Sequence, residues 1–322
     1  MSNHSFKGGE NIRQIHLTFD VEDFIGANSI DALFSVLRIL EKNKLRGLFF
    51  ITGHMAEKIA DFPSILSLLN SHEIGYHSSS HSVRPAIFEF TDIEDYDKAY
   101  EISLQRETSH INPITGLIES QGGITALRAL FPEKKIVAYR GPGLFWSPPH
   151  LEALRDLGLK LDFSTNISKT PVNHKGITFY PFPLFSQWSG NTSQILTLML
   201  RLFRFKNSVL LCHPNLLADE EFWDSIYWKG NPEALTQPLP KKPVEIWYSF
   251  FRFSCSARLI RLLKSTKLAT TETQLTEART PLRISRASVE NWYQQSINWP
   301  KLIFNYEPRF LRKHFLRFFG ID

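Results

Sequence analysis

Two histidines separated by three serines are the residues of this 322-residue chain whose spacing most directly suggests chemistry. They form the segment His77-Ser-Ser-Ser-His81. Imidazoles four positions apart lie on the same face of one helical turn, so both can bind one metal ion. The serines between them also suit a tight turn at the end of a strand. The spacing therefore predicts a metal site, and the alternative is a pair of surface histidines.

A cluster of carboxylates precedes the histidines, in the segment Asp20-Val-Glu-Asp23. Like charges this close raise one another's pKa unless a cation compensates them. One carboxylate can join two histidines around a divalent metal, and another can act as a general base on water. Glu22 shares a strand face with Asp20, whereas Asp23 reaches the metal only if the strand breaks there. Either of them can therefore be the third metal ligand. The alternative to a metal site is that the three carboxylates belong to an exposed acidic loop or to the start of a helix.

Strands that alternate with helices must position these residues. The predicted strands are 15–19, 47–52, 73–77, 136–140, 161–164, 177–182 and 208–213, and the predicted helices include 31–40, 63–70, 96–108, 148–157 and 193–204. This alternation indicates a parallel sheet of βαβ units, and we expect a distorted or incomplete (β/α) barrel of the TIM type. Asp20, His77, Arg140 and His213 fall at the carboxyl ends of four strands, where barrel enzymes assemble their active sites.

The sequence pattern changes after His213, so we expect a barrel over residues 1–215 and an aromatic, basic, mostly helical extension over 216–322. Residues 220–239 are predicted as a loop, and 244–267 and 308–319 as helices. The chain has 15 basic and 6 acidic residues between Lys241 and Asp322, against 22 and 26 before them. The extension either packs on the barrel through its aromatic side chains or makes peripheral contact with an anionic membrane. The acidic body argues against nucleic acid as a partner.

Taken together, these segments resemble the polysaccharide deacetylases of carbohydrate esterase family 4. The matching segments, in the order that the family has them, are Thr18-Phe-Asp-Val-Glu-Asp23, His77-Ser-Ser-Ser-His81, Arg140-Gly-Pro142 and Leu210-Leu-Cys-His213. The resemblance implies a metal-dependent hydrolase of amide bonds other than peptide bonds. It implies that His77 and His81 bind a divalent metal, with zinc as the first choice.

The resemblance also implies roles for the remaining polar residues. Asp20 would be the general base, and Arg140 would hold it. His213 would be the general acid that protonates the leaving amine. Asp162, a weaker match, would orient that histidine. The family's commonest motif has two adjacent aspartates, whereas the spaced Asp-Val-Glu-Asp segment resembles a subgroup that includes relatives acting on amides and small cyclic substrates.

The expected activity is N-deacetylation of an N-acetylated sugar in a bacterial surface polysaccharide or its precursor. The substrate would be a glycan, a nucleotide sugar or a lipid-linked sugar. Pro142 is expected in one wall of the pocket, and Phe145, Trp146, Trp188 and Trp223 are candidates for stacking on sugar rings. The alternatives are a metal-dependent amidohydrolase of a small cyclic amide or ureide, and a catalytically silent glycan-binding module.

The sequence contains fewer signals for the cellular compartment and the oligomeric state than for the active site. The N-terminus lacks the apolar core of a signal peptide, and the longest apolar runs are interrupted by basic residues. Cys212 and Cys255 do not define a disulfide framework. We therefore expect a cytoplasmic protein, peripheral to the inner membrane face if the basic extension docks there. The sequence leaves the oligomeric state open.

Overall fold

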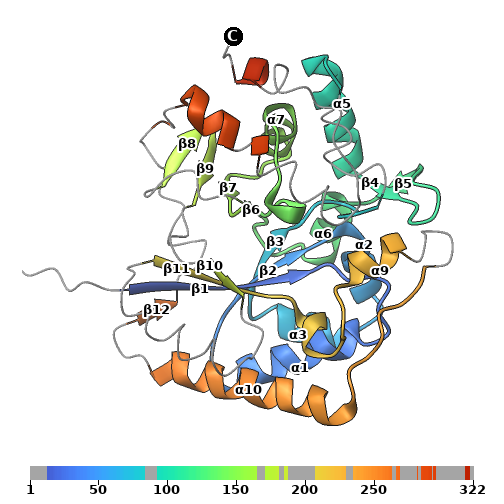
Figure 1. Ribbon diagram of the computed structural model, residues 1–322, viewed down its shortest axis with the longest axis vertical. Coiled ribbons are helices and arrows are strands. Elements are labelled where there is room, and N and C mark those ends of the chain that lie inside the picture. The colour runs from blue at the N-terminus through green and yellow to red at the C-terminus, as the bar shows by residue number, and fades with distance from the viewer. Residues whose placement is uncertain are drawn as a thin grey trace, which may run out of the picture.

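A ten-stranded, mostly parallel sheet forms the centre of the molecule (Figure 1). The structure is a computed structural model, and it describes residues 13–83, 93–164, 171–180, 185–187, 207–229, 235–262, 266–268, 281, 284–291, 293–294 and 316–319. The strand order is β10-β11-β1-β2-β3-β6-β7-β9-β8, and β12 pairs with the start of β1. Every pairing in this sheet is parallel except that of β8 with β9. Over the described residues β10 and β8 do not pair, so the curled sheet stays open, which confirms the predicted incomplete barrel.

The strands lie close to where the sequence pattern predicts them. Their bounds are β1 (Arg13–Val21), β2 (Leu48–Ile51), β3 (Glu73–Tyr76), β6 (Ala138–Tyr139), β7 (Leu161–Asp162), β8 (Val172–His174), β9 (Ile177–Phe179), β10 (Phe185–Gln187), β11 (Asn207–Cys212) and β12 (Thr266–Leu268). β2 is buried along its whole length, as expected for a parallel strand covered on both faces. In the core, Phe19 of β1 stacks on Phe49 of β2 with ring centroids 4.5 Å apart.

Helices cover the sheet and connect its strands. Their bounds are α1 (Ser29–Lys42), α2 (Gly53–Ile59), α3 (Pro63–Leu69), α5 (Tyr96–Glu107), α6 (Ile124–Leu130), α7 (Pro148–Asp156), α9 (Trp223–Lys229) and α10 (Pro243–Leu262), with short 3-10 turns η1 (Pro142–Leu144) and η2 (Pro214–Leu217). A small hairpin of β4 (Ser109–Ile111) and β5 (Ile118–Gln121) stands apart from the main sheet. α1 buries Leu33, Val36, Leu37 and Leu40, which follow the helical period.

The helices after β9 differ in part from those that the sequence predicts. The segment 220–239, predicted as a loop because it is rich in Trp and Pro, contains the helix α9. The predicted helix 193–204 lies outside the described residues, as does most of 308–319. In the described part of the chain, no helix is both long enough and apolar enough to span a membrane.

Candidate active site and metal centre

Four strand ends bring their polar residues together, as the sequence predicts. Asp20 lies near the end of β1, His77 follows β3, Arg140 follows β6 and His213 follows β11. Oδ2 of Asp20 is 3.7 Å from Nε2 of His77 and 3.8 Å from Nε2 of His213. The convergence follows from the parallel sheet, because the carboxyl ends of neighbouring strands meet at one edge.

A buried arginine holds the catalytic candidate Asp20. Nη1 of Arg140 donates to Oδ1 of Asp20 at 2.7 Å and to the hydroxyl of Thr18 at 3.0 Å. Nε of Arg140 donates to the carbonyl of Phe163 at 3.3 Å, and the guanidinium lies over the ring of Phe50. Arg140 therefore fixes one oxygen of Asp20 and leaves the other directed toward the histidines.

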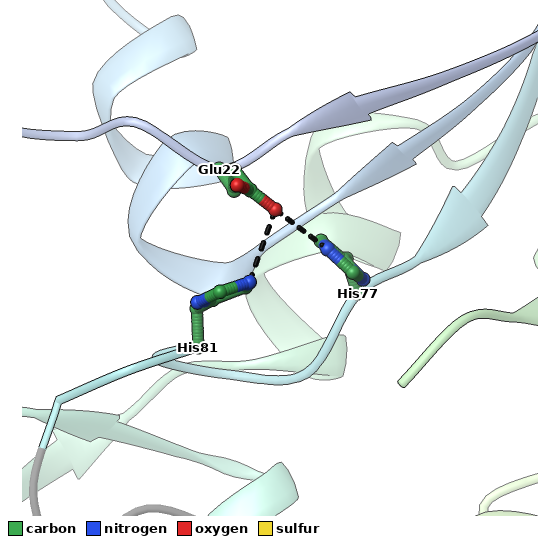
Figure 2. A group of neighbouring side chains, drawn as sticks. All are labelled: Glu22, His77 and His81. Carbon is green, nitrogen blue, oxygen red and sulfur yellow. Dashed lines mark hydrogen bonds and ion pairs between the residues drawn. The ribbon is translucent and has the colours of Figure 1, made fainter. Parts of the chain in front are cut away.

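Glu22 lies with the two histidines (Figure 2), whereas Asp23 is held elsewhere by backbone hydrogen bonds. Oε2 of Glu22 is 2.8 Å from Nε2 of His77 and 3.0 Å from Nε2 of His81. All three side chains are buried. Asp23 turns the other way, and its Oδ1 accepts hydrogen bonds from the backbone N–H groups of Ile25 and Gly26. The geometry thus favours Glu22 of the two alternatives for the third ligand.

The segment between the histidines is a strained loop and not a helical turn. Ser78 and His81 have positive φ angles of 65° and 50°, which cost side-chain-bearing residues of the order of 1 kcal/mol each. The backbone N–H of Gly53, at the start of α2, donates to the carbonyl of Ser78 at 3.0 Å. The N–H of Ser79 donates to Oε2 of the buried Glu107 at 3.0 Å. The surrounding elements therefore impose the conformation that brings both imidazoles to one point.

In both histidines Nδ1, the ring nitrogen that faces away from Glu22, lies within hydrogen-bonding distance of a neighbouring group. Nδ1 of His77 lies 2.6 Å from the carbonyl of Arg140, which can only accept, so Nδ1 carries the proton. Nδ1 of His81 lies 2.6 Å from the hydroxyl of Ser82, and that hydroxyl donates to Oδ2 of Asp224 at 3.4 Å. Both rings therefore direct Nε2 toward Glu22, in the arrangement of metal-binding histidines.

The charges around Glu22 fit a divalent cation. Burial raises the pKa of Glu22, but His81 and His213 outweigh burial and hold it well below its usual range. Burial lowers the pKa of His77, but Asp20 and Glu22 outweigh it and shift it upward. Burial lowers the pKa of His81. Oε2 of Glu22 lies about 3 Å from both Nε2 atoms, and ligands at about 2.0–2.2 Å from one divalent ion have a similar separation.

Helix α9 contributes two contacts that the sequence did not reveal. The indole N–H of the buried Trp223 donates to Oε1 of Glu22 at 3.0 Å, and its ring packs against His81 with centroids 5.3 Å apart. Asp224 accepts from Ser82, the partner of His81, and burial followed by the charge of Glu22 raises the pKa of Asp224 well above its usual range. Trp223 is therefore not available to stack on a sugar, and the site extends beyond the boundary expected at residue 215.

A pocket of about 330 Å³ opens beside these residues. It is lined by Asp20, Glu22, His77, His81, Gly141, Gly143, Leu144, Leu211, His213 and Phe222. Pro142 is buried as the first residue of η1, and its neighbours form the wall. Phe222, which the sequence did not mark, stands edge-on to His213 with ring centroids 5.1 Å apart. A short loop of small residues thus forms one wall, and an aromatic ring lies beside the candidate acid.

Two expected site residues, Asp162 and Trp146, do not occupy their expected positions, and a third lies outside the described residues. Asp162 does not orient His213, because its oxygens accept from the N–H and the hydroxyl of Ser164, and β7 is five strands away from β11 in the sheet order. Nδ1 of His213 has no hydrogen-bond partner among the described residues. Trp146 is buried against Phe179 in the core, so it cannot stack on a sugar. Trp188 lies outside the described residues.

Asp162 supports the pocket wall instead. The hydroxyl of Ser164, which donates to Asp162, accepts from the backbone N–H of Gly141 at 2.7 Å. A Cβ atom at Gly141 would lie 2.0 Å from the carbonyl oxygen of Phe145. The wall therefore passes too close to its own backbone for any residue other than glycine at this position.

Comparisons with known proteins agree with this description. Residues 7–161 match the polysaccharide deacetylase family, so this part of the chain is a domain of that family and the family predicted from the motifs is confirmed. No curated protein sequence matches the chain. A structure from Mycobacterium smegmatis, provisionally named a polysaccharide deacetylase, has 18% identity and a TM-score of 0.52, and the match covers 87% of this chain and 96% of that one. This likeness supports the fold.

Two further solved structures match with lower TM-scores. The catalytic domain of a peptidoglycan N-acetylglucosamine deacetylase from Eubacterium rectale has 14% identity and a TM-score of 0.41, with 88% of this chain and 98% of that one covered. A family 4 carbohydrate esterase pseudoenzyme from Bacillus anthracis has 15% identity and a TM-score of 0.36, with 64% and 56% covered.

Proposed function

We propose that this protein is a metal-dependent N-deacetylase that removes acetyl groups from an N-acetylated sugar. The observation that carries the proposal is the convergence of the buried Glu22, His77 and His81 beside Asp20 and His213 at the edge of one pocket. The polysaccharide deacetylase match over residues 7–161 supports a hydrolase of sugar N-acetyl groups.

Three residues would hold the metal in this proposal. Nε2 of His77, Nε2 of His81 and Oε2 of Glu22 would be its ligands, with zinc as the first choice and cobalt, nickel or iron as alternatives. When bound, the ion would polarise the acetyl carbonyl and lower the pKa of water. The contacts of Nδ1 with the carbonyl of Arg140 and with the hydroxyl of Ser82 orient both rings so that Nε2 faces the position of the metal.

Asp20 and His213 would move the protons. Arg140 engages Oδ1 of Asp20, so Oδ2 remains to accept a proton from the attacking water. Oxygen adds to the acetyl carbon, the carbon–nitrogen bond breaks, and the products are acetate and a free amine. Nε2 of His213 lies 3.8 Å from Oδ2 of Asp20 and faces the same pocket, so it would deliver the proton to the leaving nitrogen.

The pocket suits a single sugar residue. Its volume of about 330 Å³ is at the low end for ligand sites, and Leu144, Leu211 and Phe222 give it apolar walls. The sugar would belong to a bacterial surface polysaccharide, or to a nucleotide-linked or lipid-linked precursor in the cytoplasm.

Acetate release from metal-loaded protein tests the proposal, with N-acetylated oligosaccharides compared against small ureides. We expect acetate from the oligosaccharides, and about 10²-fold or greater loss of kcat in Asp20→Asn with the metal content retained. Tyr100→Phe, on the exposed side of α5, is the matched control and should keep full activity. Hydrolysis of ureides alone would favour a cyclic amidohydrolase. Glycan binding without hydrolysis would favour a silent binding module, and either result refutes the proposal.

A further inference from the structure

The outward face of α10 is mostly apolar. The helix packs on the body of the protein through Phe253, Ser256, Ala257 and Ile260. The opposite face exposes Val244, Trp247, Tyr248, Phe251, Cys255, Leu259 and Leu262, and we call these residues the α10 face. Val244, Trp247 and Leu262 are each more than 60% exposed. Figure 1 shows α10 lying along one side of the molecule, beside α1.

A helix on the surface of a globular protein normally directs polar side chains to solvent. On α10 the exposed charged residues are only Glu245, Arg258 and Arg261. Trp247 and Phe251, one turn apart, stack in parallel with ring centroids 5.3 Å apart, so the two rings form one continuous apolar surface. Phe34 of α1, also exposed, extends this surface across the groove between α1 and α10. An exposed apolar surface of this kind marks an interaction site.

The charges along α10 indicate what the surface contacts. Three arginines flank the α10 face, at positions 252, 258 and 261, whereas Glu245 in the first turn is the acidic residue of the helix. The guanidinium of Arg252 lies 3.8 Å from the ring centre of Tyr248. Tryptophan and tyrosine beside basic residues are typical of helices that lie at the boundary between lipid head groups and acyl chains.

We propose that the α10 face docks on an anionic membrane surface, with its aromatic rings at the level of the head groups and its arginines on lipid phosphates. A second copy of this chain is the other occupant that such a surface could bind, and the test below distinguishes it from a membrane. The proposal goes beyond the deacetylase function and does not depend on it.

The chain provides its own probe for the test. Cys255 lies on the α10 face and is exposed, whereas Cys212, the other cysteine of the sequence, is buried. An environment-sensitive fluorophore on Cys255 should shift to shorter wavelength with vesicles that contain about one-third phosphatidylglycerol, and much less with pure phosphatidylcholine. In a sedimentation assay with unlabelled protein, Trp247→Ser combined with Phe251→Ser should lower the partition coefficient about tenfold or more.

Leu117→Ser provides the matched control. Leu117 is 65% exposed on the β4–β5 hairpin, distant from α10 in Figure 1, so its loss should leave partitioning unchanged. Asp20→Asn should also partition normally, which separates this proposal from the catalytic one. Absence of a shift with anionic vesicles, or an equal loss of partitioning in Leu117→Ser, would overturn it. The proposal would also be overturned if the fluorescence shift occurred without vesicles and grew with protein concentration while light scattering detected a dimer. In that case the α10 face would bind a second copy of the chain.

Discussion

The hydrogen bond from Trp223 to Glu22 gives the most specific prediction for the proposed metal centre. Replacing Trp223 by Phe keeps a buried aromatic ring against His81 and removes only the indole N–H. Oε1 of the buried Glu22 then loses its indole donor. Glu22 should become free to rotate away from the histidines, and the metal should bind more weakly.

The size of this effect follows from the contact. A hydrogen bond to a charged group contributes about 1.5–3 kcal/mol, and leaving the buried oxygen unpaired incurs a cost of similar size. Loss of a group that orients a metal ligand typically weakens metal affinity about 10- to 100-fold, which corresponds to about 1.4–2.8 kcal/mol. Both values lead to the same expectation, a Kd for zinc about 10- to 100-fold higher in Trp223→Phe.

Competition with a chromogenic chelator measures the Kd directly, without reference to turnover. Tyr227→Phe is the matched control, because Tyr227 lies on the same helix, packs on Trp223 and donates to the carbonyl of Pro113 instead of to the metal ligands. Thermal unfolding of both metal-free variants measures any general loss of stability. A change in Kd below about threefold in Trp223→Phe, or an equal change in Tyr227→Phe, would refute the reasoning.

Two other predictions concern the carboxylates and a buried histidine. Glu22→Gln should weaken metal binding at least about 100-fold, whereas Asp23→Asn should leave it within about threefold. Metal content after dialysis measures both effects, and a larger loss in Asp23→Asn would make Asp23 the ligand. Burial, with smaller contributions from Arg46 and Lys134, lowers the pKa of His72 to about 4, and its Nδ1 accepts from the N–H of Gly47. Because the unfolded chain takes up this proton near pH 6.5 and the folded protein only near pH 4, His72 should cost the fold about 2–3 kcal/mol between pH 7 and pH 4.5. In urea unfolding, His72→Asn should lose correspondingly less stability over that range, and an unchanged pH dependence would exclude this role.

The sequence predicts the parts of the site that depend on strand ends. Asp20, His77, Arg140 and His213 each follow an apolar run of strand length, and a parallel sheet brings such positions to one edge. The spacing of His77 and His81 predicts a shared site even though the connecting loop is not helical. The sequence predicts these features correctly because they depend on the local residue pattern and on the general geometry of parallel sheets.

The remaining features depend on contacts between segments far apart in the chain. The sequence did not decide whether Glu22 or Asp23 is the third metal ligand, because the choice depends on where the backbone turns after β1. In the structure, Oδ1 of Asp23 accepts hydrogen bonds from the N–H groups of Ile25 and Gly26 and so points away from the histidines. Asp162 was assigned to His213 by analogy, whereas Ser164 satisfies its carboxylate locally. A buried tryptophan needs an acceptor for its indole N–H, but this rule alone does not identify Glu22, about 200 residues earlier, as the partner of Trp223.

The two halves of the site come from different parts of the chain. The family match over residues 7–161 includes Glu22, both histidines, Asp20 and Arg140, which are the candidates for metal ligands, base and its anchor. His213, Phe222 and Trp223 all follow residue 161, and they are the candidate acid, a pocket wall and the partner of Glu22. Since the indole of Trp223 donates to Glu22, helix α9 belongs to the proposed metal centre. The segment after β11 therefore both supports the proposed ligand set and shapes the pocket beside the candidate acid, so we expect differences in substrate among proteins with such a site to arise there.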